Sequence, residues 1–311
     1  MNLRFLETFL WIARLGSFRA AAGKLNLTQA AVSGRIASLE NDLGLPLFER
    51  GSREIRLTPA GRTLIRYAEQ IMAADQAMRE ALKGPRTVQG RIRLGIVESI
   101  VHTWFAPFMT RLHDTYPHLE IELTVESTLR LHDLIKRGAI DVALQTDPVI
   151  AEGIWNRPLG RLRMGFIGGP SAEVGETITL EQIVHRWPIV TFPRHSQPHT
   201  SLLEVIEREG VSMPRIHFVS SIAASIQLID NGLGVGTLPV AALHSGIQEG
   251  LYRLLPCSVG LPDLRLIVSW QPDPLAGLSE AVIAVAIDEM HRFAAVSEYA
   301  IAPPPTPISD F

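Results

Sequence analysis

The N-terminal fold is decided by residues 16–61, which read GSFRAAAGKLNLTQAAVSGRIASLENDLGLPLFERGSREIRLTPAG. Ser17 and Thr28 are the predicted N-caps of two consecutive helices, which a tight connection at residues 26–27 joins. Along the second helix the apolar residues recur on one face and leave small and amide side chains facing outward. Such side chains suit base edges in a major groove, so the pattern predicts a helix-turn-helix.

A β-hairpin is predicted next, because two short runs flank the Gly/Ser turn at residues 51–54. Arg50, Arg53 and Arg56 give this hairpin three cations, which can neutralise DNA phosphates or enter a minor groove. Taken alone, a hairpin with three arginines is also compatible with a solvated surface. Beside a helix-turn-helix, DNA contact is the better interpretation.

Charge is distributed unevenly along the 311 residues, whose net charge is −3. Residues 1–90 carry 13 Lys and Arg against 8 Asp and Glu, whereas the rest of the chain carries 16 against 24. The N-terminal part is therefore positive by 5 and the remainder negative by 8. Such an asymmetry is a hint of a nucleic-acid-binding segment that is joined to a different domain. Charge alone does not distinguish this from ordinary fluctuation over 90 residues, so the motifs must decide.

Residues 9–61 resemble the DNA-binding domain of LysR-type transcriptional regulators. The motifs that carry the resemblance are Gly16-Ser17-Phe18, Ala20-Ala21-Ala22, Leu27-Thr28-Gln29-Ala30-Ala31-Val32-Ser33, Leu47-Phe48-Glu49-Arg50 and Leu57-Thr58-Pro59-Ala60-Gly61. The resemblance implies an all-α winged helix-turn-helix domain over residues 1–58. The DNA-contacting residues that we expect are Thr28, Gln29, Ala30, Ser33, Arg35, Arg50, Arg53 and Arg56. Ala30 stands where the family usually has proline, and Gly34 stands where it often has a large polar residue, which leaves more of the base readout to Gln29 and Ser33.

A long helix is predicted over residues 59–84, with Thr58 as its N-cap. Its apolar residues Leu64, Ile71 and Met78 fall seven apart and form a seam that we expect to mediate dimerisation. The alternative is that this seam packs onto the C-terminal domain of its own chain. Gly and Pro residues make residues 85–90 a predicted hinge, which favours the dimer.

Strand and helix patterns alternate over residues 91–300, which predicts an α/β domain that binds ligands at the carboxyl ends of its parallel strands. This part resembles the effector-binding domain of the same family, which is similar to periplasmic binding proteins. The resemblance implies two lobes, at about 91–163 with 268–300 and at about 164–267, and we expect residues 301–311 to form a flexible tail. The helices predicted in this domain include residues 101–115, 129–137, 201–209 and 221–231.

Small polar side chains recur where the predicted strands hand over to helices, and their hydroxyls and the following backbone N–H groups can hold an anionic oxygen. The effector-binding residues that we expect there are Ser99, Ile100, Ser127, Thr128, Ser196, His199, Ser220 and Ser221. Each serine on its own is better explained as a helix cap, and only their recurrence at successive strand ends favours a binding site. Arg194 and His195 favour an anionic effector, whereas Glu98 favours one that also carries a cation or a hydroxyl. We therefore expect a small polar organic acid, zwitterions included.

Enzymatic functions are disfavoured, because the sequence has no nucleophile elbow and its Gly-rich stretch at residues 232–236 lacks the spacing of a nucleotide loop. Pro198 lies between His195 and His199 and argues against a metal site on a helix face. The single cysteine, Cys257, excludes an internal disulfide framework. We expect no catalytic residue, no cofactor, no metal and no membrane contact.

The sequence therefore predicts a cytoplasmic LysR-type transcriptional regulator that binds double-stranded DNA at a dyad-symmetric promoter site. We expect it to be a homodimer or homotetramer, with a small-molecule effector in the C-terminal cleft and RNA polymerase as a further partner. An effector-independent repressor or activator of the same family stays open as an alternative, as does a solute-binding protein. The second alternative leaves the basic wing and the long helix without a purpose.

Overall fold

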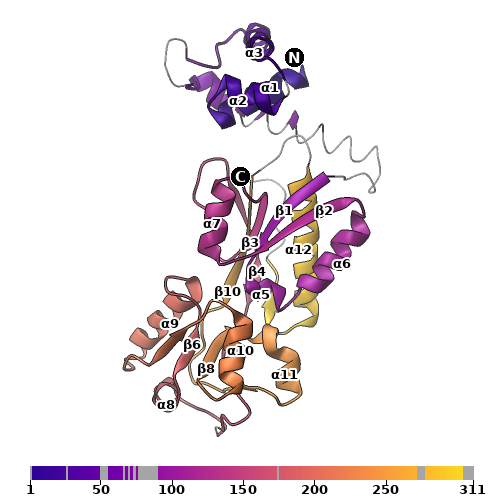
Figure 1. Ribbon diagram of the computed structural model, residues 1–311. Coiled ribbons are helices and arrows are strands. Elements are labelled where there is room, and N and C mark those ends of the chain that lie inside the picture. The colour runs from indigo at the N-terminus through magenta and orange to yellow at the C-terminus, as the bar shows by residue number, and fades with distance from the viewer. Residues whose placement is uncertain are drawn as a thin grey trace. The chain divides into compact units, whose positions relative to one another are not determined.

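The computed structural model describes residues 2–25, 27–49, 55–65, 67–68, 71–72, 75, 90–173, 175–271 and 277–303 (Figure 1). The chain divides into two compact units. The first comprises Met1–Thr87 with Pro272–Leu278, and the second comprises Val88–Gln271 with Ser279–Phe311. Among the described residues, no helix combines the length and the apolar character needed to cross a bilayer.

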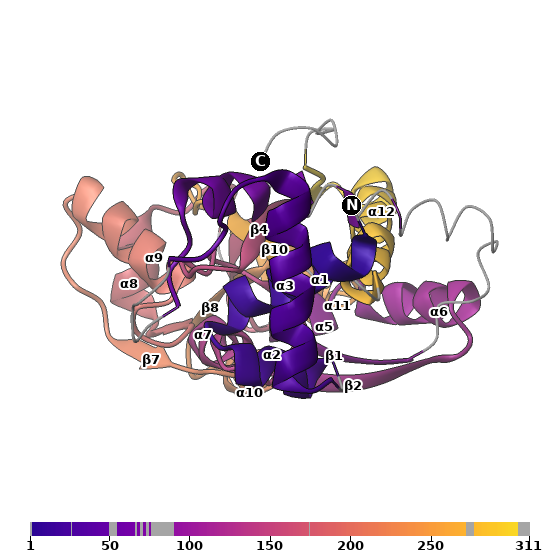
Figure 2. The same cartoon turned by 90° about the horizontal axis from the view of Figure 1, so that it is seen from above.

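Three helices build the first unit: α1 (Leu3–Leu15), α2 (Phe18–Lys24) and α3 (Gln29–Leu43). The predicted caps are confirmed, because Ser17 accepts a hydrogen bond from the backbone N–H of Ala20 and Thr28 accepts one from that of Ala31. Gly44 ends α3 in the left-handed conformation, at φ 69°, which glycine adopts without steric cost. α1 and α2 both pack against α3 (Figure 2), so the helix-turn-helix is confirmed.

The wing follows α3 as a short antiparallel pairing of Phe48 with Leu57, next to a hydrogen bond from Glu49 N–H to the Arg56 carbonyl. The side chain of Glu40 fixes where the wing begins, because its Oε1 accepts the backbone N–H of Leu47 at 2.7 Å. The turn of the wing, with the predicted contacts Arg50 and Arg53, lies outside the described residues.

Helix follows the wing at residues 59–65, 67–68, 71–72 and 75. Ala68 and Met72 are buried in the core of the first unit, and two members of the predicted seam, Leu64 and Ile71, pack partly against that core. The third member, Met78, lies outside the described residues. The start of the long helix is therefore anchored on the helix-turn-helix.

The second unit contains two sheets, each of which forms a lobe with its helices (Figure 1). In lobe I the strand order is β11-β4-β10-β3-β1-β2, and β1 pairs in parallel with β2 and β3. These strands are β1 (Gly90–Ile96), β2 (Leu119–Val125), β3 (Val142–Gln145), β4 (Trp155–Leu162), β10 (Leu264–Trp270) and β11 (Ala300–Ile301). The helices of lobe I are α5 (Glu98–Val101), α6 (Phe105–Thr115), α7 (Thr128–Lys136) and α12 (Leu278–Val296).

Lobe II has the strand order β7-β6-β8-β5-β9, in which β6 pairs in parallel with β7 and β8. Its strands are β5 (Met164–Gly168), β6 (Ile189–Thr191), β7 (Ile216–Phe218), β8 (Val235–Pro239) and β9 (Arg253–Leu254). Its helices are α8 (Leu180–Arg186), α9 (Gln197–Arg208), α10 (Ile222–Asp230), the 3-10 turn Val240–Leu243 and α11 (His244–Gln248). The predicted two-lobed α/β architecture is confirmed.

Proline explains why two helices differ from the prediction. The helix expected over residues 101–115 is split into α5 and α6, because Pro107 has no N–H to donate to the carbonyl four residues earlier and therefore lies in the first turn of a new helix. α9 starts at Gln197 instead of residue 201, because Pro198 is tolerated in the first turn behind the Ser196 cap.

The sequence does not predict β4, which contains Pro158. In the structure Pro158 lies opposite Ile267, where the register between β4 and β10 shifts, so the interrupted ladder accommodates a residue without an N–H. β10 pairs with β4 from Leu264 onward, so the chain returns to lobe I earlier than the predicted residue 268.

Candidate functional site

The N-terminal half of α3 presents an exposed polar surface on the first unit. Thr28, Gln29, Ala30 and Ser33 are exposed on it, whereas Val32 and Ile36 are buried. A side chain on this surface is free to reach a base edge because it is not needed for packing. These four residues lie where the sequence places the DNA contact.

The predicted arginine contacts differ in their surroundings. Arg35 is half-buried, and its Nη1 donates a hydrogen bond to Thr8 Oγ1 of α1 at 3.2 Å. This bond fixes the guanidinium beside α1 and so limits how far it can move. Arg56 is exposed on the wing, where its carbonyl also accepts the N–H of Glu49.

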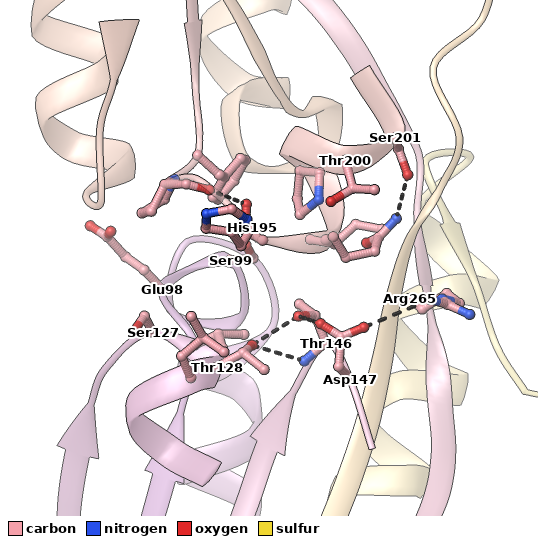
Figure 3. Close-up of a pocket in the computed structure, with 18 of the residues that line it drawn as sticks. Glu98, Ser99, Ser127, Thr128, Thr146, Asp147, His195, Thr200, Ser201 and Arg265 are labelled. Carbon is pink, nitrogen blue, oxygen red and sulfur yellow. Dashed lines mark hydrogen bonds and ion pairs between the residues drawn. The ribbon is translucent and has the colours of Figure 1, made fainter. Parts of the chain in front are cut away.

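A cleft of about 1100 Å³ separates the two lobes of the second unit. Figure 3 shows Ser127, Thr128, Thr146 and Asp147 on one side of it and His195, Thr200 and Ser201 on the other. Six of the eight predicted effector-binding residues line the cleft, namely Ser99, Ser127, Thr128, Ser196, Ser220 and Ser221. The other two do not line it: Ile100 is fully buried, and its N–H bonds to the Val97 carbonyl, while His199 is only 7% exposed and lies behind the wall.

A hydrogen-bonded group forms the floor of the cleft on the lobe I side, and Thr128 is the one member that the sequence analysis predicted (Figure 3). Thr146 Oγ1 lies 2.8 Å from Thr128 Oγ1 and donates to Asp147 Oδ2 at 3.1 Å. His132 Nε2 lies 3.0 Å from the backbone carbonyl oxygen of Asp147. Arg265 forms an ion pair with the side-chain carboxylate of Asp147 at 3.7 Å. The signal was available for two of these residues, because Thr146 and Asp147 directly follow β3 at the same edge of the sheet.

The lobe II wall contains a strained turn. His195 has φ 65°, a conformation that is uncommon for a residue with a side chain, and its N–H donates to His199 Nδ1 at 3.2 Å. Burial lowers the pKa of His199, and the neighbouring Arg194 and His195 lower it further. His199 is therefore a neutral acceptor that holds the turn in place. Among the described residues, no cluster of three side chains suits a metal ion.

Charged side chains of both signs line the cleft. The carboxylates belong to Glu98, Glu126, Asp147, Glu204 and Asp263, and the guanidinium groups belong to Arg161, Arg194 and Arg265. Three helices, α7, α9 and α10, also begin at its walls. The uncapped N–H groups of α7 and the three arginines attract anions, while the carboxylates attract cations.

A winged helix-turn-helix followed by a two-lobed α/β unit with a polar cleft defines a DNA-binding regulator that has a ligand-binding domain. Residues 3–62 match the family model described as a bacterial regulatory helix-turn-helix protein of the lysR family, and residues 85–290 match that of the LysR substrate binding domain. The chain belongs to the LysR family of transcriptional regulators.

Several transcriptional regulators are similar over most of the chain. The transcriptional regulator GltR of Bacillus subtilis is 27% identical over 253 residues, which are 81% of this chain and 84% of that protein. A probable hydrogen peroxide-inducible genes activator of Streptomyces viridosporus is 33% identical over 254 residues, 79% of each chain. The structure of an OxyR variant of Corynebacterium glutamicum bound to H2O2 is similar in fold, with a TM-score of 0.56, 23% identity and 94% of both chains covered. Regulators of this family bind DNA and small-molecule effectors and oligomerise.

Proposed function

We propose that this regulator binds a dyad-symmetric promoter site as a homodimer or homotetramer, and that a small zwitterionic organic acid in the cleft controls this binding. The observation that carries the proposal is the lining of the cleft, where carboxylates, guanidinium groups and helix N-termini converge around about 1100 Å³. A pocket of this size accepts a small metabolite, and charges of both signs favour a ligand that also carries both.

The DNA contact is assigned to the exposed start of α3 and to the wing. Gln29 and Ser33 have exposed polar side chains on the surface of α3 and would read base edges. Arg56, with Arg50 and Arg53 of the wing turn, would supply attraction to phosphates and the minor groove. Two copies of this unit, held by the apolar seam of the long helix, would read the two halves of a dyad.

The effector's anionic group is assigned to the lobe I wall. In the part of the chain that the structure describes, no side chain caps the N-terminus of α7, which leaves its first N–H groups open to a ligand. The hydroxyls of Ser127 and Thr128 lie at this N-terminus and line the cleft. A ligand that engages both lobes stabilises one arrangement of them, and through linkage it changes the spacing of the DNA-binding units. RNA polymerase is a further partner that such a change would affect.

The test is a thermal-shift titration of the full chain with three matched sets of small molecules: amino acids, the corresponding carboxylic acids without the amine, and the corresponding amines. A ligand at 100 times its Kd stabilises the folded state by about 2.7 kcal/mol. We expect a saturable rise in Tm with a member of the first set only. The same compound should change the affinity for promoter DNA in a gel shift.

Thr128→Val should abolish the rise, because it removes a hydroxyl that lines the cleft while keeping the volume of the side chain. Ser245→Ala is the matched control, since Ser245 is an exposed hydroxyl on α11, away from the cleft. If the ligand binds Thr128→Val as tightly as the wild type, the effector site is misplaced. A regulator that binds its promoter but responds to no compound in the three sets would instead support the effector-independent alternative.

A further inference from the structure

The carboxylate of Glu98 in lobe I reaches across the cleft to the first turn of α10 in lobe II. Its Oε2 accepts the backbone N–H of Ile222 at 2.7 Å, and its Oε1 accepts the hydroxyl of Ser221 at 3.0 Å and the N–H of Ala223 at 3.5 Å. On its other side, Oε1 lies 3.4 Å from His102 Nε2, one turn further along lobe I. This carboxylate links two segments that are 124 residues apart.

The contact uses the donors that make a helix N-terminus attractive to an anion. The first N–H groups of a helix have no partner within the helix. In α10, Glu98 accepts those of Ile222 and Ala223, and the Ser221 hydroxyl accepts that of Ala224 at 3.3 Å. The next N–H, that of Ser225, already bonds to the carbonyl of Ser221. No donor in this turn is left for the anionic group of a ligand.

α7, on the opposite wall, offers a contrast within the same cleft. Its N-cap residue, Ser127, makes no capping hydrogen bond with its side chain, although residues 127–136 are all described by the structure. The two helix N-termini therefore differ: one carries a carboxylate supplied by the protein, and the other does not. Because a bound carboxylate also brings a negative charge, the α10 end repels a second anion and attracts a cation.

We propose that Glu98 is a specificity-determining residue, a tethered carboxylate that occupies the anion site of α10, excludes an effector's anionic group from that end of the cleft and favours a cationic group there. The consequence for the effector rests on the proposed function, in which the cleft binds a zwitterion. The occupancy of α10 by Glu98 does not depend on it. The same contact joins lobe I to lobe II, so it also favours the arrangement in which the lobes are close.

Chemical rescue of Glu98→Ala with acetate tests this proposal. The substitution removes one methylene and the carboxylate, which is the composition of acetate, and it uncovers the three donors on α10. We expect Tm of the variant to fall below that of the wild type, and sodium acetate to raise it again, saturably, by about 2–4 °C. Sodium chloride at equal ionic strength and methylammonium chloride should not raise it. The wild type should not respond to acetate, because its site is filled.

Two variants serve as controls in the same titration. Glu98→Gln keeps an oxygen that can accept the Ile222 N–H and still fills the site, so it should not respond to acetate. Glu126→Ala removes a negative charge from the exposed edge of the same cleft without uncovering α10, so it also should not respond. A response in Glu126→Ala equal to that in Glu98→Ala would show a general effect of cleft charge and overturn the proposal.

Failure of this inference and failure of the proposed function give different results. If acetate raises Tm of the wild type as much as that of Glu98→Ala, or raises neither, Glu98 does not occupy an anion site and the inference is wrong, whatever the amino acid titration shows. If Glu98→Ala alone responds to acetate but no zwitterion stabilises the wild type, the occupancy of α10 stands and the assignment of the effector class is wrong.

Discussion

Gln29→Ala should separate the recognition of a DNA sequence from the attraction to DNA in general. Gln29 is the first residue of α3, its side chain is exposed, and alanine has a higher helix propensity than glutamine. The substitution should therefore leave the fold intact while removing a side chain that can bond two atoms of one base. A good bidentate contact contributes about 1–3 kcal/mol of discrimination, which corresponds to a loss of about 5- to 150-fold in affinity for the promoter site.

Fluorescence anisotropy with two duplexes of equal length, one carrying the promoter site and one of random sequence, measures this effect at a fixed salt concentration. Random DNA should bind Gln29→Ala almost as it binds the wild type, because phosphate contacts do not depend on sequence. Arg56→Ala should weaken binding to both duplexes and reduce the slope of log affinity against log salt by about 1. If Gln29→Ala loses the same factor on both duplexes, its assignment as a base contact is refuted.

Thr28→Ala is the control for stability in this experiment. Thr28 Oγ1 accepts the N–H of Ala31 at 3.2 Å, and the loss of such a cap costs about 1 kcal/mol. For a domain of 60–100 residues this cost lowers Tm by about 4–8 °C. Gln29→Ala should show no such decrease in Tm, so any loss of promoter affinity in that variant comes from the missing contact.

Three further predictions follow from the packing. Gly61→Ala should destabilise the first unit by about 1–3 kcal/mol in thermal denaturation, because the added Cβ would lie 2.3 Å from the backbone oxygen of Leu47. Gly34→Ala should stabilise the same unit by about 1 kcal/mol, because no atom lies within 4 Å of the added Cβ. The pKa of His199 in the folded state is lowered from its ordinary value of about 6.5. The stability that His199 contributes is therefore present above about pH 6.5 and is lost as the pH falls below this value. His199→Gln should make Tm depend less on pH in this acidic range. Ile71→Glu should dissociate the oligomer in light scattering and weaken promoter binding, because it places a charge in the predicted dimer seam, beside the core of the first unit.

Each of these predictions has a result that contradicts it. Equal effects of the two glycine substitutions would show that the approach of residue 61 to Leu47 is not tight. An unchanged pH dependence in His199→Gln would assign the acid sensitivity to other groups. For Ile71→Glu, an intact oligomer with normal DNA affinity would place the dimer contact elsewhere on the chain.

The sequence alone was enough for the helix-turn-helix because the signals that specify it are local. Thr28 and Gly44, the residues at the ends of α3, act within one turn of the positions they occupy, and the burial of Val32 and Ile36 follows from helical spacing. The strand-end rule likewise placed Ser99 and Ser127 at one cleft, because they follow β1 and β2, two parallel neighbours whose carboxyl ends share an edge. These predictions needed no knowledge of which distant segments meet.

Only the tertiary structure decided where β4 forms and what the cleft residues do. The strand β4 is hidden in the sequence by Pro158, which is tolerated because a distant strand, β10, shifts its register at that point. His199 reads as a ligand in the sequence, yet burial and the neighbouring turn make it a neutral structural acceptor. Glu98 reads as a charge that opposes an anionic effector, but its partner, the first turn of α10, is more than 120 residues away. Sequence patterns report spacing along the chain, whereas the state of a helix N-terminus depends on whichever group the fold brings to it.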